Sequence, residues 1–464
     1  MNNIYVKDII EKCNGELLVG DPNLILKKFS KDTRTITEGD IYIGIKGEVF
    51  DGNTFYEEAF NKGASCCILD NIPNDLDISK YKDKTIVKVE DTIKCIQELA
   101  TYKRSLYNIP VIAVTGSVGK TSTKDIIYEV VKTKYKTLKT EGNQNNHIGL
   151  PLTILKLTDE EALVVEMGMN HLGEISVLTN IVKPTIAVIT NIGTAHIGLL
   201  GSRENILKAK LEITESMNKK DTLIINNDND LLHKEYPELK DLYKMVTIGI
   251  DNKSNYNATN IKDNIFSSTF NINNDKITVN VGSTAFIYNS LVAYAIGKEL
   301  NIKHSKIIDA IYNFKLSPHR LERKITKNNI TLIDDTYNAN FDSMINSLSI
   351  LSKVKDKRKV AILGDILELG KYSKEIHKNI GKTITKDTLD ILITIGNSSK
   401  YIKEEAINNN FPKDNIYSFK NYNESLEELP SILKPNDIVL LKASHGIELD
   451  KIVDYLMNKI NVTK

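Results

Sequence analysis

The chain has 464 residues, too many for one hydrophobic core, so we expect about three domains. Its 61 basic and 60 acidic residues are interleaved and give a net charge of +1, which argues against nucleic acid or an anionic membrane as a partner. The four cysteines lack zinc or redox spacing, the first residues lack a signal-peptide pattern, and no apolar run is long enough to cross a bilayer. We therefore expect a monomeric, cytoplasmic protein that acts on small molecules and does not insert into membranes.

Residues 1–106 alternate short strands and helices that are separated by turn signals, which predicts a small α/β domain. Arg34 follows Asp32 and Thr33 in a polar loop of this segment. An arginine there can bind a phosphate through two parallel hydrogen bonds, but it is more often a solvated surface charge. The residue pattern alone leaves both interpretations open.

The central segment, residues 107–316, opens with an apolar strand that turns through two glycines into a helix. The run is Val111-Ile112-Ala113-Val114-Thr115-Gly116-Ser117-Val118-Gly119-Lys120-Thr121-Ser122. This order is typical of a phosphate-binding loop, because the glycines let backbone N–H groups converge, Lys120 reaches terminal phosphate oxygens and Thr121 can bind Mg²⁺. The loop is a shorter variant, since Val114 stands where the common pattern has its first glycine. We expect a nucleoside triphosphate as the ligand, and an ordinary strand-turn-helix corner is the less favoured alternative.

Further apolar strands of this segment alternate with amphipathic stretches of helix length, which predicts a mostly parallel sheet covered by helices. The strands are expected at residues 162–165, 185–190 and 222–225, with an edge hairpin within residues 256–281. Candidate side chains follow the strands at their carboxyl ends, where open α/β sheets bind ligands. Glu166 follows one strand and can hold Mg²⁺, whereas His196 follows the next and by spacing alone is more often structural. Lys210 lies on a predicted helix, and its position favours a solvated lysine.

The final segment, residues 317–464, has the strict alternation of strands and helices that is typical of a nucleotide-fold domain. Its strands are expected at residues 330–333, 360–363, 389–395, 416–419 and 438–441. This second open sheet lacks the Gly-x-Gly-x-x-Gly fingerprint, so a separate dinucleotide site is not expected. Its first strand leads into Asp334-Asp335-Thr336-Tyr337-Asn338-Ala339-Asn340. The carboxylates of this cluster either meet a ligand at the strand end or cap the helix that begins near Phe341.

Several motifs occur in a fixed order along the whole chain. In the central segment they are Thr115 to Thr121, Glu141 to Thr153, Val165 to Gly168, Thr190 to His196 and Lys208 to Glu212. In the final segment they are Asp334 to Asn340 and Leu363 to Gly370, and the first segment contributes Asp32-Thr33-Arg34, Gly39-Asp40, Gly47 and Asp51-Gly52. Together these motifs resemble the Mur ligases. The absence of the Asp-Asn-Pro-Arg motif of sister ligases favours, within the family, the step that joins D-alanyl-D-alanine to UDP-N-acetylmuramoyl-tripeptide.

The resemblance implies a three-domain α/β fold. Its parts are a UDP-sugar domain at residues 1–106, a P-loop ATPase-like domain with a mostly parallel sheet at residues 107–316, and a Rossmann-like ligase domain at residues 317–464. The implied reaction serves peptidoglycan synthesis: ATP phosphorylates the carboxylate of the tripeptide, and the amine of the dipeptide attacks the acyl phosphate. The implied cofactors are ATP, two Mg²⁺ ions and a carbamate that CO₂ forms on Lys210. The third residue of the tripeptide, lysine or diaminopimelate, stays open.

The family's site residues correspond to matching positions of this sequence. Those implied to be catalytic are Lys120, His196 and Lys210. Those implied to contact ATP are Gly116, Ser117, Val118, Gly119, Lys120, Thr121, Ser122, Asn289, Arg320 and Asp335. Those implied to contact the substrates are Thr33, Arg34, Gly47, Asp51, Asn145, Asn146, Tyr337, Asn338 and Asn340. The implied metal ligands are Thr121, Glu166, His196 and carbamylated Lys210.

The sequence departs from the family pattern at a few positions that concern adenine and peptide contacts. Ser283-Thr284-Ala285-Phe286 stands before Asn289 where Gly-x-His-Asn is usual, and Phe341 follows Asn340 where a proline is usual. Two alternatives stay open. One is another ligase of the superfamily, such as one that elongates folate with glutamate, and the other is a non-catalytic ATP-binding regulator of the same fold. The intact set of predicted catalytic and metal-binding residues argues against the regulator.

Overall fold

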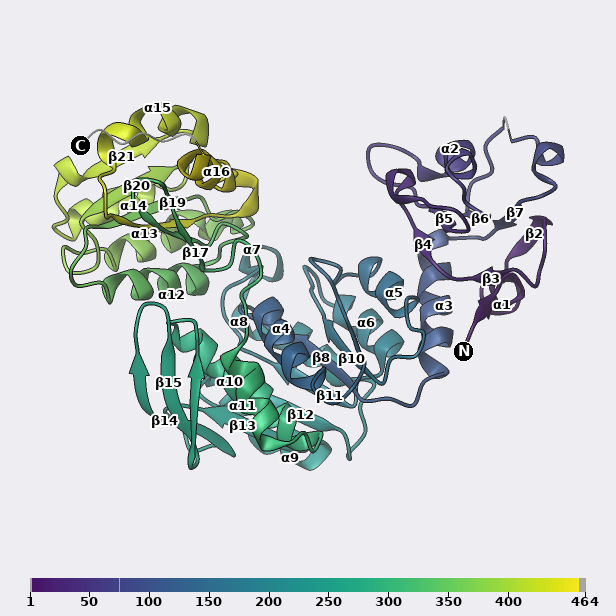
Figure 1. Cartoon of the computed structure of the whole chain (residues 1–464), viewed down its shortest axis with the longest axis horizontal. Helices are drawn as coiled ribbons and strands as arrows, with labels where there is room; N and C mark the ends of the chain where they lie inside the picture. Colours follow the sequence, from purple (N-terminus) through teal and green to yellow (C-terminus); the bar gives the residue numbers. More distant parts are fainter. Residues whose placement is uncertain (1, 75, 459–464) are drawn as a thin grey trace.

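The computed structural model describes residues 2–74 and 76–458. Its strands form sheets of five, nine and six strands along the chain, together with a small two-stranded sheet. Figure 1 shows an open arc, in which an N-terminal lobe (residues 2–105) and a C-terminal lobe (residues 322–458) stand apart on a central lobe (residues 111–312). The fold is mixed α/β with mostly parallel sheets, as the alternation of strands and helices predicted.

The N-terminal lobe is a small α/β unit. Its strands are β1 (Ile4–Tyr5), β2 (Glu16–Val19), β3 (Ile25–Leu26), β4 (Phe29–Ser30), β5 (Ile41–Gly44), β6 (Cys66–Leu69) and β7 (Thr85–Lys88), and its helices are α1 (Val6–Lys12), α2 (Tyr56–Asn61) and α3 (Thr92–Ser105). The five-stranded sheet has the order β2-β7-β6-β5-β4 and is parallel except for the pair of β2 and β7. β5 and β6 are buried along their whole length, as expected for parallel strands that are covered on both faces.

The central lobe contains the nine-stranded sheet. Its strands are β8 (Val111–Thr115), β9 (Thr137–Lys139), β10 (Ala162–Glu166), β11 (Ile186–Ile189), β12 (Thr222–Asn226), β13 (Lys244–Gly249), β14 (Tyr256–Asp263), β15 (Ser268–Ile272) and β16 (Asp275–Val279). The order is β16-β15-β14-β13-β12-β11-β8-β10-β9, and within this sheet, as the structure describes it, the predicted edge hairpin of β14 to β16 alone is antiparallel. The chain leaves β8 toward one edge and returns to build the other, so the sheet has its switch point beside β8. Open α/β sheets bind ligands at such a point.

Helices cover both faces of the central sheet. They are α4 (Lys120–Val131), α5 (Gly149–Ile154), α6 (Glu174–Val182), α7 (Ile197–Leu200), α8 (Arg203–Leu211), α9 (Asp230–Leu242), α10 (Thr284–Glu299) and α11 (His304–Tyr312). On one face α4, α10 and α11 share an apolar core, and on the other α5, α6, α8 and α9 share a second one. α3 of the N-terminal lobe belongs to the second core, and Nε of Arg104 donates to the carbonyl of Val182 at 2.8 Å. One continuous core therefore attaches the N-terminal lobe to the central sheet.

The C-terminal lobe contains the six-stranded sheet. Its strands are β17 (Glu322–Ile325), β18 (Thr331–Asp334), β19 (Lys359–Gly364), β20 (Ile391–Ile395), β21 (Ile416–Phe419) and β22 (Ile438–Lys442), in the order β17-β18-β22-β19-β20-β21. Its helices are α12 (Phe341–Ser352), α13 (Ser373–Lys382), α14 (Lys400–Asn408), α15 (Tyr422–Ile432) and α16 (Asp450–Asn458). The edge strand β17 runs antiparallel to β18. It was not predicted, because three of its four residues are charged.

Helix α12 is capped by Asn340 and not by the aspartates that precede it. Oδ1 of Asn340 accepts the Ser343 N–H at 2.9 Å, and Oγ of Ser343 accepts the Asn340 N–H at 3.0 Å. This reciprocal pair satisfies two backbone donors at the start of the helix. The interpretation of Asp334 and Asp335 as helix caps is therefore wrong, and their carboxylates make other contacts.

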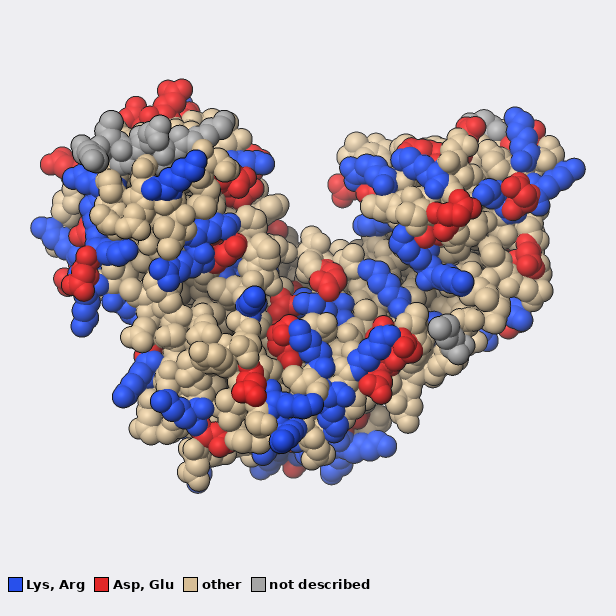
Figure 2. Space-filling view, viewed as in Figure 1, with Lys and Arg blue, Asp and Glu red and all other residues tan. Residues whose placement is uncertain are grey.

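Charged side chains are spread over the surface. On the face in Figure 2, lysines and arginines are interspersed with acidic residues across all three lobes, in agreement with the small net charge. None of the helices that the structure describes combines the length and the apolar character that a bilayer span requires.

Asp365, at the end of β19, anchors the loop that follows β20. Its buried carboxylate accepts the backbone N–H groups of Asn397, Ser398 and Ser399 at 2.6–3.1 Å. We predict that Asp365→Ala lowers the free energy of unfolding by about 2–3 kcal/mol, because buried donors lose a charged acceptor. Urea denaturation followed by circular dichroism measures this change. The exposed Asp414 supplies the control, since Asp414→Ala should stay within about 0.5 kcal/mol of the wild type. Equal midpoints for the two variants would contradict the prediction.

Candidate active site

A cavity of about 650 Å³ is lined by residues of the central and C-terminal lobes. It brings together most of the residues predicted to bind ATP, metal or peptide. These are Ser117, Val118, Gly119, Lys120, Thr121, Ser122, Asn145, Asn146, Glu166, His196, Asn289, Arg320, Asp335, Tyr337, Asn338 and Asn340. The other predicted residues lie outside the lining: Gly116 and Lys210 are buried, and Thr33, Arg34, Gly47 and Asp51 belong to the N-terminal lobe.

The phosphate-binding loop starts where β8 ends and is braced by the segment after β11. Gly116 has a φ of 148°, and a Cβ atom there would lie 1.9 Å from Oγ1 of Thr190, so only glycine fits. Oδ1 of Asn191 accepts the N–H groups of Ser117 at 3.1 Å and Val118 at 2.9 Å. Two loop N–H groups that the sequence pattern assigned to phosphate are thus engaged by the protein. Asn191 was not predicted, although it stands directly after a predicted strand.

Lys120 is the first residue of α4 and follows Gly119, whose φ of 83° turns the chain into the helix. Its Nζ donates to the carbonyl of Gly116 at 2.9 Å, so the side chain folds back over the loop. Burial lowers the pKa of Lys120, and the cation of Arg320 adds to this effect, whereas the carboxylate of Glu166 opposes it. An anion beside Lys120 would relieve the cost of holding this ammonium away from water.

Glu166 and His196 each carry a buried atom without a hydrogen bond. Glu166 is 3% exposed and its Oε1 accepts the side-chain amide of Asn145 at 2.8 Å, but its Oε2 has no partner. Nδ1 of His196 also lacks a hydrogen bond, although Oε2 of Glu368 lies 3.2 Å away. Within residues 2–74 and 76–458, these two are the buried side-chain nitrogen or oxygen atoms that have no hydrogen-bond partner. An unpaired carboxylate oxygen and an unpaired imidazole nitrogen are both metal-ligand types, so the chemistry of these residues fits the metal site that the resemblance implies.

The imidazole of His196 is neutral at pH 7. Burial lowers its pKa to about 4, and the cations of Lys120 and Lys210 add to the effect. The residue has a φ of 63° at the start of α7, and it lines the cavity. A neutral imidazole keeps the lone pair that metal coordination requires, and protonation would remove it only as the pH falls toward 4.

Lys210 is buried, so its interpretation as a solvated lysine is wrong. It lies near the end of α8 and is 1% exposed. Burial lowers the pKa of Lys210 well below its ordinary value, and the cation of Lys120 adds to the effect. Lys210 in turn adds to the lowering of the His196 pKa, after burial and Lys120. It is therefore far more often uncharged at pH 7 than a lysine in water.

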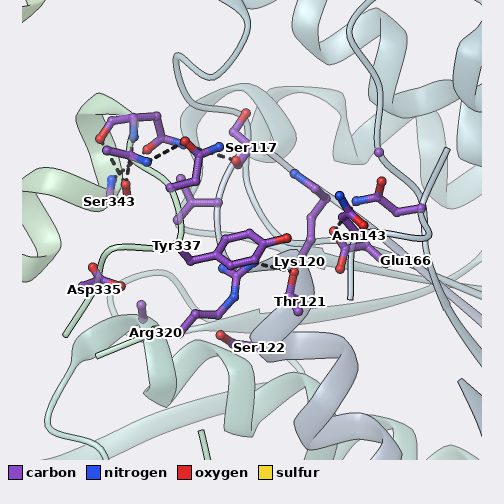
Figure 3. Close-up of a pocket in the computed structure, with 18 of the residues that line it drawn as sticks. Ser117, Lys120, Thr121, Ser122, Asn143, Glu166, Arg320, Asp335, Tyr337 and Ser343 are labelled. Carbon is purple, nitrogen blue, oxygen red and sulfur yellow. Dashed lines mark hydrogen bonds between the residues drawn. The ribbon is translucent and has the colours of Figure 1, made fainter. Parts of the chain in front are cut away.

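The C-terminal lobe and the segment that leads into it contact the phosphate-binding loop directly (Figure 3). Nη2 of Arg320 donates to Oγ1 of Thr121 at 2.9 Å, and the guanidinium lies 4.0 Å from the ring centre of Tyr337. Nδ2 of Asn340 donates to the carbonyl of Ser117 at 3.4 Å. The two lobes thus meet at the loop where the sequence predicts the triphosphate.

Two further contacts join these lobes near His196. Oδ2 of Asp342, on α12, accepts the backbone N–H of Thr194 at 3.0 Å. The hydroxyl of Tyr372 donates to the carbonyl of Gly201 at 2.9 Å. The segment that carries His196 is therefore held from the C-terminal side as well as from the central sheet.

The other predicted asparagines make hydrogen bonds within the protein in this structure. Oδ1 of Asn146 accepts the N–H of Gly149 at 2.9 Å, and Oδ1 of Asn338 accepts the N–H of the next residue at 2.8 Å. Oδ1 of Asn289, on α10, accepts the hydroxyl of Thr123 at 2.9 Å, which ties α10 to the first turns of α4. These side chains line the cavity, and each already contributes to holding its wall in place.

Lys442 also lines the cavity and was not predicted as a site residue. It ends β22, which pairs in parallel with β18, so Lys442 and Asp335 lie side by side at two strand ends. Its Nζ donates to Oδ2 of Asp335 at 2.5 Å. A polar residue that directly follows an apolar strand was the signal that identified Asp335, and the same signal was present at Lys442.

The predicted residues of the N-terminal lobe form a separate group. Arg34 has a side chain that is 83% exposed, and it pairs with the carboxylate of Asp32 at 2.7 Å. Its hydrogen bond lowers the pKa of Asp32 to about 2. The hydroxyl of Thr33 donates to Glu58 at 2.9 Å, and Oδ1 of Asp51 accepts the N–H of the residue two positions on. Figure 1 shows this lobe across an open space from the C-terminal lobe.

Two protein-family models match the chain. Residues 114–297 match the Mur ligase middle domain, and residues 319–445 match the Mur ligase, glutamate ligase domain. The UDP-N-acetylmuramoyl-tripeptide–D-alanyl-D-alanine ligase of Bacillus subtilis (strain 168) is 33% identical over 460 residues, which cover 97% of this chain and 98% of the relative. The enzyme of the same name from Escherichia coli (strain K12) is 31% identical over 409 residues, with coverages of 87% and 88%.

Solved structures agree over nearly the whole chain. MurF from Acinetobacter baumannii superposes with a TM-score of 0.89 at 28% identity, and the match covers 98% of this chain and 99% of that one. MurF ligase from Thermotoga maritima, solved in complex with ADP, gives a TM-score of 0.80 at 27% identity, with coverages of 93% and 97%. In sequence over its full length and in its three-lobed structure, the chain belongs to the Mur ligase family.

Proposed function

We propose that the protein is an ATP-dependent ligase that joins D-alanyl-D-alanine to UDP-N-acetylmuramoyl-tripeptide and so makes the pentapeptide precursor of peptidoglycan. The observation that carries the proposal is one cavity that unites the phosphate-binding loop, the unsatisfied Glu166 and His196, and the polar wall of the C-terminal lobe. The full-length relatives that bear this enzyme name support the choice of substrates. The domain roles follow, with residues 1–106 for the UDP-sugar, 107–316 for ATP and 317–464 for the dipeptide.

The reaction has two steps that make different demands on the site. The tripeptide carboxylate attacks the γ-phosphate of ATP, and ADP leaves. The dipeptide amine then attacks the carbonyl carbon of the acyl phosphate, and inorganic phosphate leaves. Lys120 stabilises the charge on the transferring phosphoryl group, and Arg320 contributes a second cation from the opposite wall. Each step depends on reacting atoms being held near attack distance, so most of the catalysis is positioning.

The metal ligands in this proposal are Thr121, Glu166 and His196. Mg²⁺, when bound, neutralises the crowded phosphate and carboxylate oxygens. Glu166 contributes the oxygen that has no protein partner, and the neutral ring of His196 contributes a nitrogen. Arg320 donates to one lone pair of the Thr121 hydroxyl oxygen here, and the second lone pair stays available for a cation.

Lys210 supplies the remaining anionic group in the proposal. A neutral amine adds to CO₂ and loses a proton, and the product is a carbamate with a terminal carboxylate. The burial of Lys210 and its lowered pKa favour the uncharged amine that this addition needs. The modification places an anion on Lys210, which balances the positive charge of Lys120 and supplies an oxygen ligand for the metal.

The first test of the proposal is product formation. The purified protein with ATP, Mg²⁺, UDP-N-acetylmuramoyl-tripeptide and D-alanyl-D-alanine should form the pentapeptide, detected by mass spectrometry, and should release phosphate only when both peptides are present. Lys120→Ala should lower kcat by about 10²–10³-fold, because it removes a preorganised charge at the phosphoryl group. Lys132→Ala, at an exposed lysine just after the same helix, is the control and should leave kcat unchanged. ATP binding without product from either lysine or diaminopimelate tripeptide would favour the regulator, and turnover with folate and glutamate would favour the other ligase.

The carbamate makes a separate prediction. Lys210→Ala should lose most of the activity and regain part of it with millimolar acetate or formate, because a short carboxylate can replace the missing anion. Removal of CO₂ and bicarbonate should lower wild-type activity reversibly. Lys208→Ala changes an exposed lysine on the same helix and should respond to neither treatment. Absence of rescue, together with an unmodified Lys210 at neutral pH in a crystal structure, would remove this role.

Arg34 tests the role of the N-terminal lobe. Arg34→Ala should raise KM for the UDP-linked tripeptide about 10-fold and leave kcat and KM for ATP nearly unchanged, because its contact is with a part of the substrate that does not react. Steady-state kinetics with each substrate varied in turn measures the two effects. Lys80, another exposed cation of this lobe, gives the matched control Lys80→Ala. A fall in kcat with no change in KM would contradict the assignment.

A further inference from the structure

Arg320 lies in a strained segment between the central and C-terminal lobes. The residues on either side of it, His319 and Leu321, have φ values of 61° and 54°. Left-handed backbone is unfavourable for residues other than glycine, and most of all for bulky ones such as leucine. Two such residues around one arginine persist only where surrounding contacts hold them. Two buried carboxylates supply such contacts, one on each side of Arg320.

On the first side, the carboxylate of Asp334 holds His319. Asp334 is 0% exposed, and its Oδ2 lies 2.9 Å from Nδ1 of His319 and accepts from Nζ of Lys324 at 2.6 Å. Its Oδ1 accepts the hydroxyl of Thr336 at 2.7 Å. Burial raises the pKa of Asp334, but the hydrogen bond from Lys324 and the other contacts outweigh burial and keep the pKa below its ordinary value. The carboxylate therefore stays charged and keeps its hydrogen bond with His319.

On the second side, the carboxylate of Asp335 holds Leu321. Its Oδ1 accepts the backbone N–H of Leu321 at 3.2 Å. Its Oδ2 accepts from Nζ of Lys442 at 2.5 Å and from the hydroxyl of Ser347 at 2.6 Å. Lys442 is 2% exposed and also donates to the carbonyl of Asn338 at 3.1 Å. Asp335 thus links β22 and α12, through Lys442 and Ser347, to the segment that carries Arg320.

The two carboxylates are neighbours at the end of β18, and each acts on one neighbour of Arg320. The antiparallel pairing of β17 with β18 puts Glu322 opposite Asp334, so the segment before β17 runs past the end of β18. The backbone N–H of Tyr337 donates to the carbonyl of His319 at 3.1 Å. This contact brings the ring of Tyr337 under the guanidinium of Arg320, and Figure 3 shows the pair beside Thr121.

We propose that Lys324 with Asp334 and Lys442 with Asp335 are positioning residues that hold Arg320 against the phosphate-binding loop. These two ion pairs are named here as the Arg320 clamp. The inference rests on the proposed function, in which Arg320 acts on the triphosphate, and it gives Asp335 a role through Arg320 in addition to any contact of its own with ATP. A buried lysine that holds an aspartate, rather than a nucleotide, is the part of the site that the sequence pattern did not indicate.

A double-mutant cycle tests the clamp. Arg320→Ala should lower kcat/KM for ATP about 10²-fold, and Lys442→Met should lower it by at least about 10-fold while KM for the UDP-linked tripeptide stays unchanged. If Lys442 acts through Arg320, the double variant Arg320→Ala/Lys442→Met should be no worse than Arg320→Ala alone. Losses that multiply in the double variant would overturn the proposal, and so would a wild-type kcat/KM for Lys442→Met.

A general loss of stability would not give this non-additive pattern. A second buried ion pair in the same lobe serves as a control that separates a loss of stability from a loss of Arg320 positioning. Arg358 donates to the buried Asp437 at 2.7 Å, and neither residue lines the cavity. Arg358→Met should lower the thermal midpoint without changing kcat/KM below that midpoint. If Lys442→Met does not fold, Lys324→Met tests the other side of the clamp, because Lys324 is partly exposed. If the losses in kcat/KM of Lys324→Met and Arg320→Ala multiplied in the double variant, the proposal would be overturned.

Measurements of nucleotide affinity test the clamp separately from the proposed ligase activity. A non-hydrolysable ATP analogue, titrated calorimetrically with Mg²⁺, should show the same non-additive pattern in Kd for Arg320→Ala, Lys442→Met and the double variant. A wild-type protein that makes no pentapeptide but shows this pattern refutes the ligase proposal and supports the clamp. A wild-type protein that makes pentapeptide but gives additive changes in Kd refutes the clamp alone.

Discussion

The crowding of basic groups out of water is the constraint on which the site depends. Burial lowers the pKa values of Lys120, His196 and Lys210, and neighbouring basic groups lower them further: Arg320 acts on Lys120, Lys120 acts on Lys210, and both lysines act on His196. Bringing like charges together away from water is costly, and the carboxylate of Glu166 offsets only part of this cost. The charge is balanced when an anion enters. A triphosphate on the loop and a carboxylate on Lys210 would each supply negative charge where the structure has too little.

The same excess of positive charge that favours binding of an anion also acts on the reaction. Groups that are held apart from water by the fold cannot reorganise at the moment of reaction, so their fields act fully on the charge that develops during phosphoryl transfer. The fold holds them from several directions. Lys120 starts α4, Glu166 ends β10, His196 starts α7 and Lys210 lies on α8, all at or near the carboxyl edge of the central sheet. Arg320 enters from the segment that leads into the C-terminal lobe.

The C-terminal lobe completes the cavity in the same way as the central lobe, with polar side chains at the ends of its strands. Its sheet also carries polar side chains at strand ends, here Asp335 after β18 and Lys442 at the end of β22. The two sheets face each other through these edges, and direct contacts such as Asp342 with Thr194 fix the distance between them. The N-terminal lobe is attached differently, through the apolar packing of α3, and its polar residues stay outside the cavity.

The sequence by itself determined the features that depend on neighbouring residues. Apolar runs located the parallel strands, the alternation around residues 256–281 located the edge hairpin, and the spacing of Gly116, Gly119 and Lys120 located the phosphate-binding loop. These features follow from backbone geometry and from the periodicity of strands and helices, which act over a few residues. β17 was not predicted, because a short edge strand of mostly charged residues has no apolar pattern.

Only the tertiary structure decided which polar residues are buried and with whom they pair. Lys210 and the exposed Lys208 lie two residues apart on one helix, and only packing against distant elements makes the first a buried amine. Asp335 bonds to Lys442, which is 107 residues away in the chain, and it also accepts the backbone N–H of Leu321, next to Arg320. Burial and charge pairing depend on segments that meet after folding, whereas strand and loop patterns are local, and this is why the sequence predicted the second kind and not the first.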